Sequence, residues 1–260
     1  MTGMLPCAAS IFRRPWGNRG AQARSAPYLG SMTETLILAA ILIPCLIIAI
    51  VFHEVAHGWA ALALGDPTAK EKRRLSFNPV RHVDPVGTLL VPGALALFGG
   101  PVFGWAKPVP VNPRRLDNPR YGMMAVAAAG PGMNIALAFL AAIIVGIAAA
   151  FATNWGSSLP EWALTAFTYF ILINTFLALF NLLPIPPFDG SHILGGLLPR
   201  KWARHWQKLQ ALGMTLIFVI IAAAWIFPDA RWIERTIWPP VMWIMEFFKG
   251  IAKSVELALS

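Results

Sequence analysis

The sequence predicts an all-α integral membrane protein, a polytopic bundle of about five to six transmembrane segments. Of its 260 residues, 57% are hydrophobic and only 13% are charged, whereas roughly a quarter of the residues of a soluble domain are charged. Several apolar windows approach or exceed the ~20 residues that cross a bilayer. The net charge of +9 does not indicate nucleic-acid binding, because no basic run is interleaved with stacking aromatic residues.

The first half of the chain contains one clean membrane helix and one broken segment. An uncharged run over residues 36–52 predicts a helix that continues to about residue 64, where the sequence GDP stops it. Pro44 is expected to bend this helix, which membrane helices tolerate. Residues 83–113 are apolar but rich in Gly and Pro, so we expect a re-entrant, partly extended segment with a strand-like end, KPVPVNP.

The second half predicts further membrane helices over residues 123–152, 162–182 and 209–227. The first of these is rich in Ala and Gly, the small residues that let membrane helices pack closely. The second helix breaks at the sequence PIPPFDG, where clustered prolines cannot continue a helix. The tail from residue 232 mixes aromatic and charged residues, which predicts an amphipathic helix at the membrane surface or an additional span.

These elements divide the chain into three parts. Residues 1–31 hold four arginines and no acid, and we expect a basic N-terminal extension that is disordered or precedes the native start at Met32. Residues 32–228 form the membrane core, and residues 229–260 form the C-terminal amphipathic or additional membrane helix. A start at Met32 also removes the four arginines from the outer side of the membrane, where the positive-inside rule disfavours them.

Charge also predicts the orientation of the helices. The connectors 66–85, 107–120 and 199–208 carry most of the Lys and Arg, and the connector 153–161 carries none. If the basic connectors are cytoplasmic, the first helix runs from outside to inside, and the broken segment returns to the side from which it started.

Three polar residues inside the first helix form a metal-binding motif. His53, Glu54 and His57 match H-E-x-x-H, and residues four apart lie on one face of a helix, so both imidazoles can bind one metal ion. Zinc suits imidazole nitrogen and does no redox chemistry. Glu54 is then placed to act on a water molecule at the metal. The alternative is a pair of core histidines bonded to backbone carbonyls, although ionisable residues in a membrane helix are costly and usually functional.

A catalytic zinc usually takes three protein ligands, and Asp189 is the candidate for the third. Between residues 121 and 199 the only acids are Glu161, in a loop, and Asp189, in PIPPFDG. Both His53 and Asp189 fall in the last part of helices that run toward the cytoplasm, so they can lie at a similar depth. The alternative is an ordinary turn aspartate before Gly190.

Five motifs in this order carry a resemblance to a known family: FHEVAHGW, NPVRHVDPVGTLLVP, GWAKPVPVNP, AAGPGMNIALA and NLLPIPPFDG. Over residues 45–200 the chain resembles the site-2 protease family of intramembrane zinc metalloproteases, specifically the small prokaryotic members without a PDZ domain. The resemblance implies one zinc ion held by His53, His57 and Asp189, with Glu54 as general base and acid. It also implies cleavage of a membrane-spanning substrate within the bilayer by a multi-pass protein of the prokaryotic cell membrane. The charge pattern predicts that the active site lies toward the cytoplasmic side.

Other polar residues in these motifs have two interpretations each. Asn134 is a donor to the transition state or substrate backbone, or it makes an interhelical hydrogen bond. Asn181 binds substrate or caps a broken helix, and His82, near Asp84, supports the metal site or orders a loop. His192 stands where relatives often have Arg, and it is a candidate partner of Asp189 or of the metal.

The predicted function is regulated intramembrane proteolysis: hydrolysis of peptide bonds within or near the membrane-spanning segment of a membrane-protein substrate. Because a helix protects its own peptide bonds, the substrate must unwind, and KPVPVNP could pair with it by strand addition. The alternative is a membrane metal transporter or a non-hydrolytic metal-binding protein, which would not need Glu54 as a base. The expected partners are the lipid bilayer and the substrate, with no nucleic acid; the sequence leaves the oligomeric state open, a homo-oligomer included.

Overall fold

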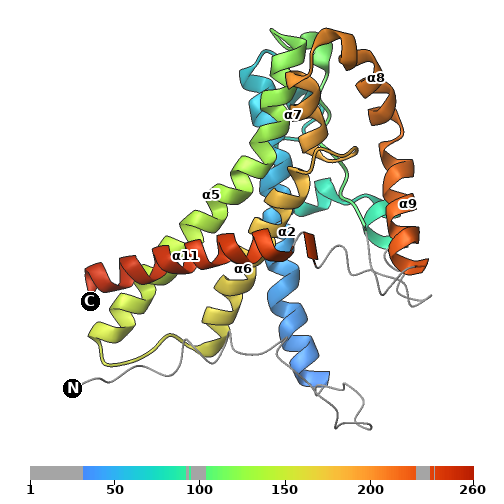
Figure 1. The fold of residues 1–260 in the computed structure, drawn as a ribbon. Helices are drawn as coiled ribbons and strands as arrows, with labels where there is room; N and C mark the ends of the chain where they lie inside the picture. The colour runs from blue at the N-terminus through green and yellow to red at the C-terminus, as the bar shows by residue number, and fades with distance from the viewer. Residues whose placement is uncertain (1–31, 92–93, 95–103, 227–234, 237) are drawn as a thin grey trace. The chain divides into compact units, whose positions relative to one another are not determined.

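The computed structural model describes residues 32–91, 94, 104–226, 235–236 and 238–260. Within these residues every regular element is helical, which confirms the predicted all-α class (Figure 1). The helices and helical turns are α2 (Met32–Ala63), α3 (Thr68–Glu71), η1 (Pro79–His82), η2 (Pro85–Leu90), η3 (Pro113–Arg115), α5 (Pro119–Asn154), α6 (Glu161–Asn181), α7 (Asp189–Leu197), α8 (Arg200–Ala211), α9 (Gly213–Ile226) and α11 (Trp238–Leu259).

Three helices among the described residues, α2, α5 and α6, are long and apolar enough to cross a bilayer. They correspond to three of the predicted spans, and less than a third of each apolar window is buried inside the protein, as expected for helices that face lipid. The chain is therefore a membrane protein. The predicted span over residues 209–227 overlaps α9 (Gly213–Ile226), and residue 227 lies outside the described residues.

Asx-Pro dipeptides start four of the helical elements. Asn78, Asp84, Asn112 and Asn118 each accept backbone N–H groups of the turn that follows, and each precedes a proline. The side-chain oxygen satisfies donors that a helix start leaves unpaired, and proline needs no N–H partner at the first helical position. Asp84 is thus a turn-ordering residue in this structure.

The end of α2 is fixed to the extended segment that precedes α5. Asp66 is fully buried; its Oδ1 accepts from the Thr68 backbone at 3.0 Å and its Oδ2 from the Asn112 backbone at 2.6 Å. Burial opposes ionisation of Asp66, but the hydrogen bonds from Thr68 and Asn112 outweigh it, and the pKa of this carboxyl is lowered. The carboxylate therefore holds two loops against the end of the helix.

Helix α5 is the central packing element of the described residues. Its second half packs on α6 and α11 through a core of small and apolar side chains: Ala138, Ala141, Ala142, Ile171, Val241, Met245 and Phe248. Its first half is tied to α7 by Arg120, whose Nε donates to the carbonyl of Gly196 at 2.9 Å and whose Nη2 donates to the carbonyl of Leu198. These contacts position α7, which begins at Asp189.

Several predictions fall on residues outside those that the structure describes. They include the N-terminal extension 1–31 and the middle of the predicted re-entrant segment, residues 92–93 and 95–103. The division of the remaining chain into a core over 32–228 and a C-terminal helix over 229–260 stays a prediction. Within the latter, α11 packs on α5 and α6, and it is not among the helices that qualify as membrane spans.

Candidate metal centre

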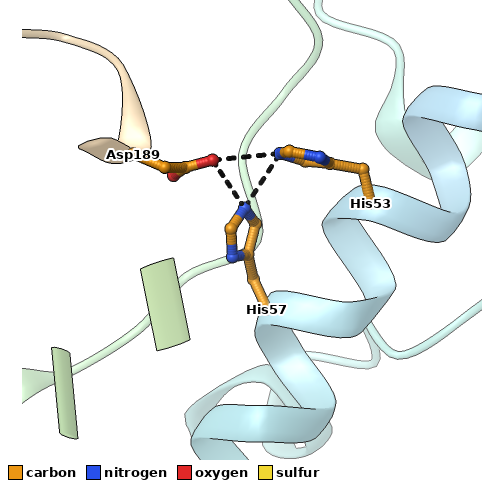
Figure 2. A group of neighbouring side chains, drawn as sticks. All are labelled: His53, His57 and Asp189. Carbon is orange, nitrogen blue, oxygen red and sulfur yellow. Dashed lines mark hydrogen bonds and ion pairs between the residues drawn. The ribbon is translucent and has the colours of Figure 1, made fainter. Parts of the chain in front are cut away.

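Helix α2 brings His53 and His57 together one turn apart, as the motif predicts. Their Nε2 atoms are 3.0 Å apart, and both residues are buried. The two imidazoles point the same way from the helix, toward Asp189 on a different segment (Figure 2). The helical spacing thus places two metal-binding nitrogens at one point inside a membrane-length helix.

Asp189 completes a triangle with the two imidazoles. It is the first residue of α7, and its Oδ2 lies 3.2 Å from Nε2 of His53 and 3.3 Å from Nε2 of His57. Among the described residues, these three form the group whose ligand atoms lie close enough to hold one metal ion. Figure 2 shows the carboxylate approaching from the side opposite the helix.

Gly190 explains how α7 begins so close to the end of α6. A Cβ at this position would lie 2.2 Å from the carbonyl oxygen of Leu182 and 2.4 Å from that of Leu183. Any other residue would push the start of α7, and with it Asp189, away from the histidines. The glycine therefore allows the close approach of two backbones.

The outer nitrogens of both imidazoles are engaged by oxygen acceptors. Nδ1 of His57 is 2.7 Å from the backbone carbonyl of Val126, and Nδ1 of His53 is 2.5 Å from Oδ1 of Asn134. A carbonyl oxygen only accepts, so each Nδ1 carries the hydrogen, and each neutral ring presents an Nε2 lone pair to the centre.

The triangle of His53, His57 and Asp189 therefore requires a positive charge at its centre. Two nitrogen lone pairs and a carboxylate at about 3 Å repel one another, more strongly where water is scarce. Oδ2 of Asp189 is buried and accepts no hydrogen bond from the part of the chain that the structure describes. Two imidazole nitrogens and one carboxylate oxygen are a donor set of catalytic zinc, which keeps a further position open. The residues present fit a zinc ion.

One stripe of α5 supports both imidazoles. This stripe consists of three residues spaced four apart: Val126, Gly130 and Asn134. Val126 contacts His57, Asn134 contacts His53, and Gly130 lies beside both rings. A Cβ on Gly130 would lie 2.4 Å from Nε2 of His57 and 2.6 Å from Cε1 of His53. The missing side chain therefore leaves the space beside the two metal-binding nitrogens that a metal ion and its ligands need.

Glu54 lies outside the metal-binding group and contacts a different segment. Its Oε2 accepts the backbone N–H of Val109 at 2.8 Å. Val109 belongs to the extended segment KPVPVNP and is 7% exposed. The carboxylate thus stands next to His53 in the chain and is held in place by a segment from outside the helix.

The remaining predicted residues lie at structural contacts in this structure. Both N–H groups of Asn134 are used, one by the Ala49 carbonyl and one by Asn174 Oδ1. Asn181 donates to the Leu177 carbonyl one turn back in its own helix. His82 lies 2.8 Å from the Ser76 carbonyl, which suits the loop-ordering interpretation.

Two further polar residues, His192 and Asn174, lie near the metal-binding group but do not belong to it. His192 does not join the described metal-binding group; its Nδ1 is 3.3 Å from Nε2 of Gln210. Asn174, which sequence reasoning missed, is fully buried in α6 and bonded to Asn134. Its signal was available, since a lone amide in an apolar membrane helix is as unusual as Asn134 itself.

Comparison with known proteins gives the family. The sequence profile described as "Peptidase family M50" matches residues 41–224, which include all three members of the metal-binding group. The chain belongs to peptidase family M50. This family confirms the resemblance predicted from the five motifs and, with the donor set of the site, the enzyme class of zinc metalloprotease and the zinc cofactor.

Curated relatives agree with this family. "Putative zinc metalloprotease YwhC" of Bacillus subtilis is 36% identical over 179 residues, covering 69% of this chain and 78% of the relative. "Putative zinc metalloprotease Rip2" of Mycolicibacterium smegmatis is 25% identical over 191 residues, covering 69% of this chain and 67% of the relative. The Mycobacterium tuberculosis protein of that name is 26% identical, with 72% and 70% covered. No solved structure matches the chain significantly.

The contact at Gly130 gives a first prediction. Gly130→Ala should lower zinc content and weaken zinc affinity at least tenfold, because its Cβ would displace the imidazole of His57 from the centre. Zinc per chain is measured on purified protein by mass spectrometry, and affinity by competition with a chelator. Gly132→Ala is the matched control in the same helix, since a Cβ there meets nothing within 4 Å. Equal zinc binding by both variants would contradict the geometry.

Proposed function

We propose that this chain is an intramembrane protease, which hydrolyses peptide bonds within or near the membrane-spanning segment of other membrane proteins. His53, His57 and Asp189 hold zinc, and Glu54 acts as general base and acid. The observation that carries the proposal is the close grouping of two imidazole nitrogens and a carboxylate oxygen. The two imidazoles come from α2, a helix long and apolar enough to span a bilayer, and the carboxylate comes from the start of α7.

The depth of the site supports cleavage inside the membrane. His53 is ten residues before Ala63, the end of α2, which corresponds to about 15 Å along a helix at 1.5 Å per residue. From Leu36, the start of the candidate span, to His53 the helix is about 25 Å long at the same rise per residue. A substrate peptide bond must therefore reach a point well inside the apolar span, where the walls limit access of water.

The residues of the site divide the chemical work. Zinc, when bound, would supply a Lewis acid that activates water and polarises the scissile carbonyl. Glu54 takes a proton from the attacking water and passes it to the nitrogen of the leaving amine, so that its carboxylate is restored. The hydrogen bond from Val109 fixes the position of that carboxylate. The outer hydrogen bonds of His53 and His57 keep their Nε2 atoms directed at the metal.

The extended segment before α5 is more suited to holding Glu54 than to forming a full ladder with substrate. Every second backbone N–H from Trp105 to Val109 already has an acceptor within the protein. The N–H of Trp105 donates to the Gly87 carbonyl and that of Lys107 to the His82 carbonyl. The N–H of Val109 donates to Glu54. Of the alternate positions 106, 108 and 110, the last two are prolines, which have no N–H to offer on the other edge. A substrate strand on that edge would find mainly carbonyl acceptors.

The distribution of charge supports a site near the cytoplasmic side of a multi-pass cell-membrane protein. Basic residues follow α2 and precede α5, at the helix ends nearer the metal-binding group: Lys70, Lys72, Arg73, Arg74, Arg81, Arg114 and Arg115. The connector 155–160 between α5 and α6 carries no charge. By the positive-inside rule the basic ends are cytoplasmic.

Replacing the general base is the direct test of proteolysis. Glu54→Gln should retain zinc but lose about 10²–10⁴-fold of its cleavage rate, because the amide cannot accept the proton. Quantitative proteomics of native membranes should then show a membrane protein that accumulates uncut. Glu71→Gln, at an exposed acid paired with Arg115, is the control and should cleave normally. If wild type cleaves nothing and instead moves zinc across the membrane regardless of Glu54, the transporter alternative holds.

Two proline substitutions test whether the extended segment holds Glu54 or pairs with substrate as a strand. Val109→Pro removes the N–H that holds the carboxylate and should lower cleavage by up to about 100-fold while zinc stays bound. Val111→Pro removes a neighbouring N–H that does not bond Glu54, and it should be much milder. Cleavage of a reconstituted substrate measures both variants. Equal loss in the two would favour strand pairing with substrate over the holding of Glu54.

A further inference from the structure

A chain of hydrogen bonds connects α6 to the imidazole of His53 through two asparagines. It starts at the backbone carbonyl of Phe170, passes through Asn174 on α6 and Asn134 on α5, and ends at His53 on α2. Both asparagines are fully buried, and His53 is 7% exposed. Polar groups at such positions need partners inside the protein, because no water is available to satisfy them.

The orientation of Asn174 follows from its own helix. Its Nδ2 lies 2.8 Å from the carbonyl of Phe170, one turn earlier. A carbonyl oxygen can only accept, so the amide nitrogen of Asn174 must face it. The Oδ1 of Asn174 is therefore the atom that faces α5, and it can only accept as well.

Asn134 is oriented in turn by two acceptors. Its Nδ2 lies 2.8 Å from Oδ1 of Asn174 and 3.2 Å from the carbonyl of Ala49. Turning this amide over would set an oxygen against two oxygens and lose both hydrogen bonds. Its Oδ1 is thus fixed toward Nδ1 of His53, at 2.5 Å, and requires a hydrogen on that nitrogen.

The last link decides which nitrogen of His53 can bind a metal. With hydrogen on Nδ1, the neutral ring has its lone pair on Nε2, which faces His57 and Asp189. We propose that Asn174 is a positioning residue, which acts through Asn134 to hold His53 in the tautomer that binds zinc through Nε2. The inference rests on the ligand set of the proposed function.

The two histidines differ in what holds the hydrogen on Nδ1. His57 bonds directly to a backbone carbonyl, that of Val126, and no side-chain substitution can remove that acceptor. His53 depends on side chains from two other helices, so its tautomer depends on how α2, α5 and α6 pack. Helix α6 also leads, after a short break, to Asp189. We call the chain of hydrogen bonds from Asn174 through Asn134 to His53 the relay. It links α6, the helix that precedes Asp189, to the imidazole of His53.

Zinc affinity of variants tests the relay. Asn174→Leu removes the shorter of the two hydrogen bonds that orient Asn134 and leaves only the 3.2 Å bond to the Ala49 carbonyl. The orientation of the Asn134 amide toward His53 is then weaker, and the zinc dissociation constant should rise about 10–100-fold. Asn174→Asp keeps an acceptor for Asn134 and should recover most of the affinity. Thr175→Val is the matched control: it is the adjacent, fully buried residue of α6, and among the described residues its hydroxyl has no hydrogen-bond partner. It should bind zinc as wild type does.

Two results would overturn the proposal: an unchanged dissociation constant in Asn174→Leu, or an equal rise in Thr175→Val, which would point to packing alone. Should Asn174→Leu fail to fold, zinc-loaded wild type decides through ¹⁵N NMR of labelled histidines, with His53 assigned from His53→Gln. Hydrogen on Nδ1 of His53 is expected, and hydrogen on Nε2 overturns the relay.

Neither readout of the relay involves cleavage, so the relay and the proposed function fail separately. If His53→Gln binds zinc as tightly as wild type, the proposed ligand set is wrong. If His53→Gln weakens zinc and Asn174→Leu does not, the ligand set stands and the relay is wrong.

Discussion

The central constraint on this structure is the mutual repulsion of the acceptor atoms at its metal centre. Two imidazole lone pairs and one carboxylate converge to about 3 Å in a mostly buried site, and only a positive charge makes that arrangement favourable. Each surrounding feature either sets up the convergence or makes room for the cation. Hydrogen bonds to the outer nitrogens direct the lone pairs inward, and Gly130 leaves the space empty of protein atoms.

Helix α5 organises the site because residues on one of its faces contact both histidines of α2. The histidines are four residues apart on α2, and their partners Val126 and Asn134 are eight apart on α5, with Gly130 midway. The order of the partners runs opposite to that of the histidines, as expected for antiparallel neighbours. The same helix then ties down α7 through Arg120. One element therefore controls both the orientation of the two imidazoles and the position of the Asp189 carboxylate.

Much of the fold and the core of the site could be predicted from sequence, because both depend on local patterns. Hydrophobic length predicts α2, α5 and α6, and H-E-x-x-H places two imidazoles on one helix face. The sequence also predicts Asp189, because Glu161 and Asp189 are the only acids between residues 121 and 199. What could not be predicted depends on contacts between helices: which acceptor each Nδ1 meets, that Asn174 orients Asn134, and that Val109 holds Glu54. The contact distance that forbids a side chain at Gly130 likewise has no local signature.

The central claim is that two imidazole nitrogens and one carboxylate oxygen hold zinc in the membrane core. X-ray absorption at the zinc edge tests it most directly, on zinc-loaded protein in lipid. The account predicts only nitrogen and oxygen neighbours at about 2.0–2.2 Å, with the scattering of two imidazole rings and the loss of one oxygen neighbour in Asp189→Ala. Sulfur at about 2.3 Å, a single imidazole, or an Asp189→Ala spectrum identical to wild type would contradict it.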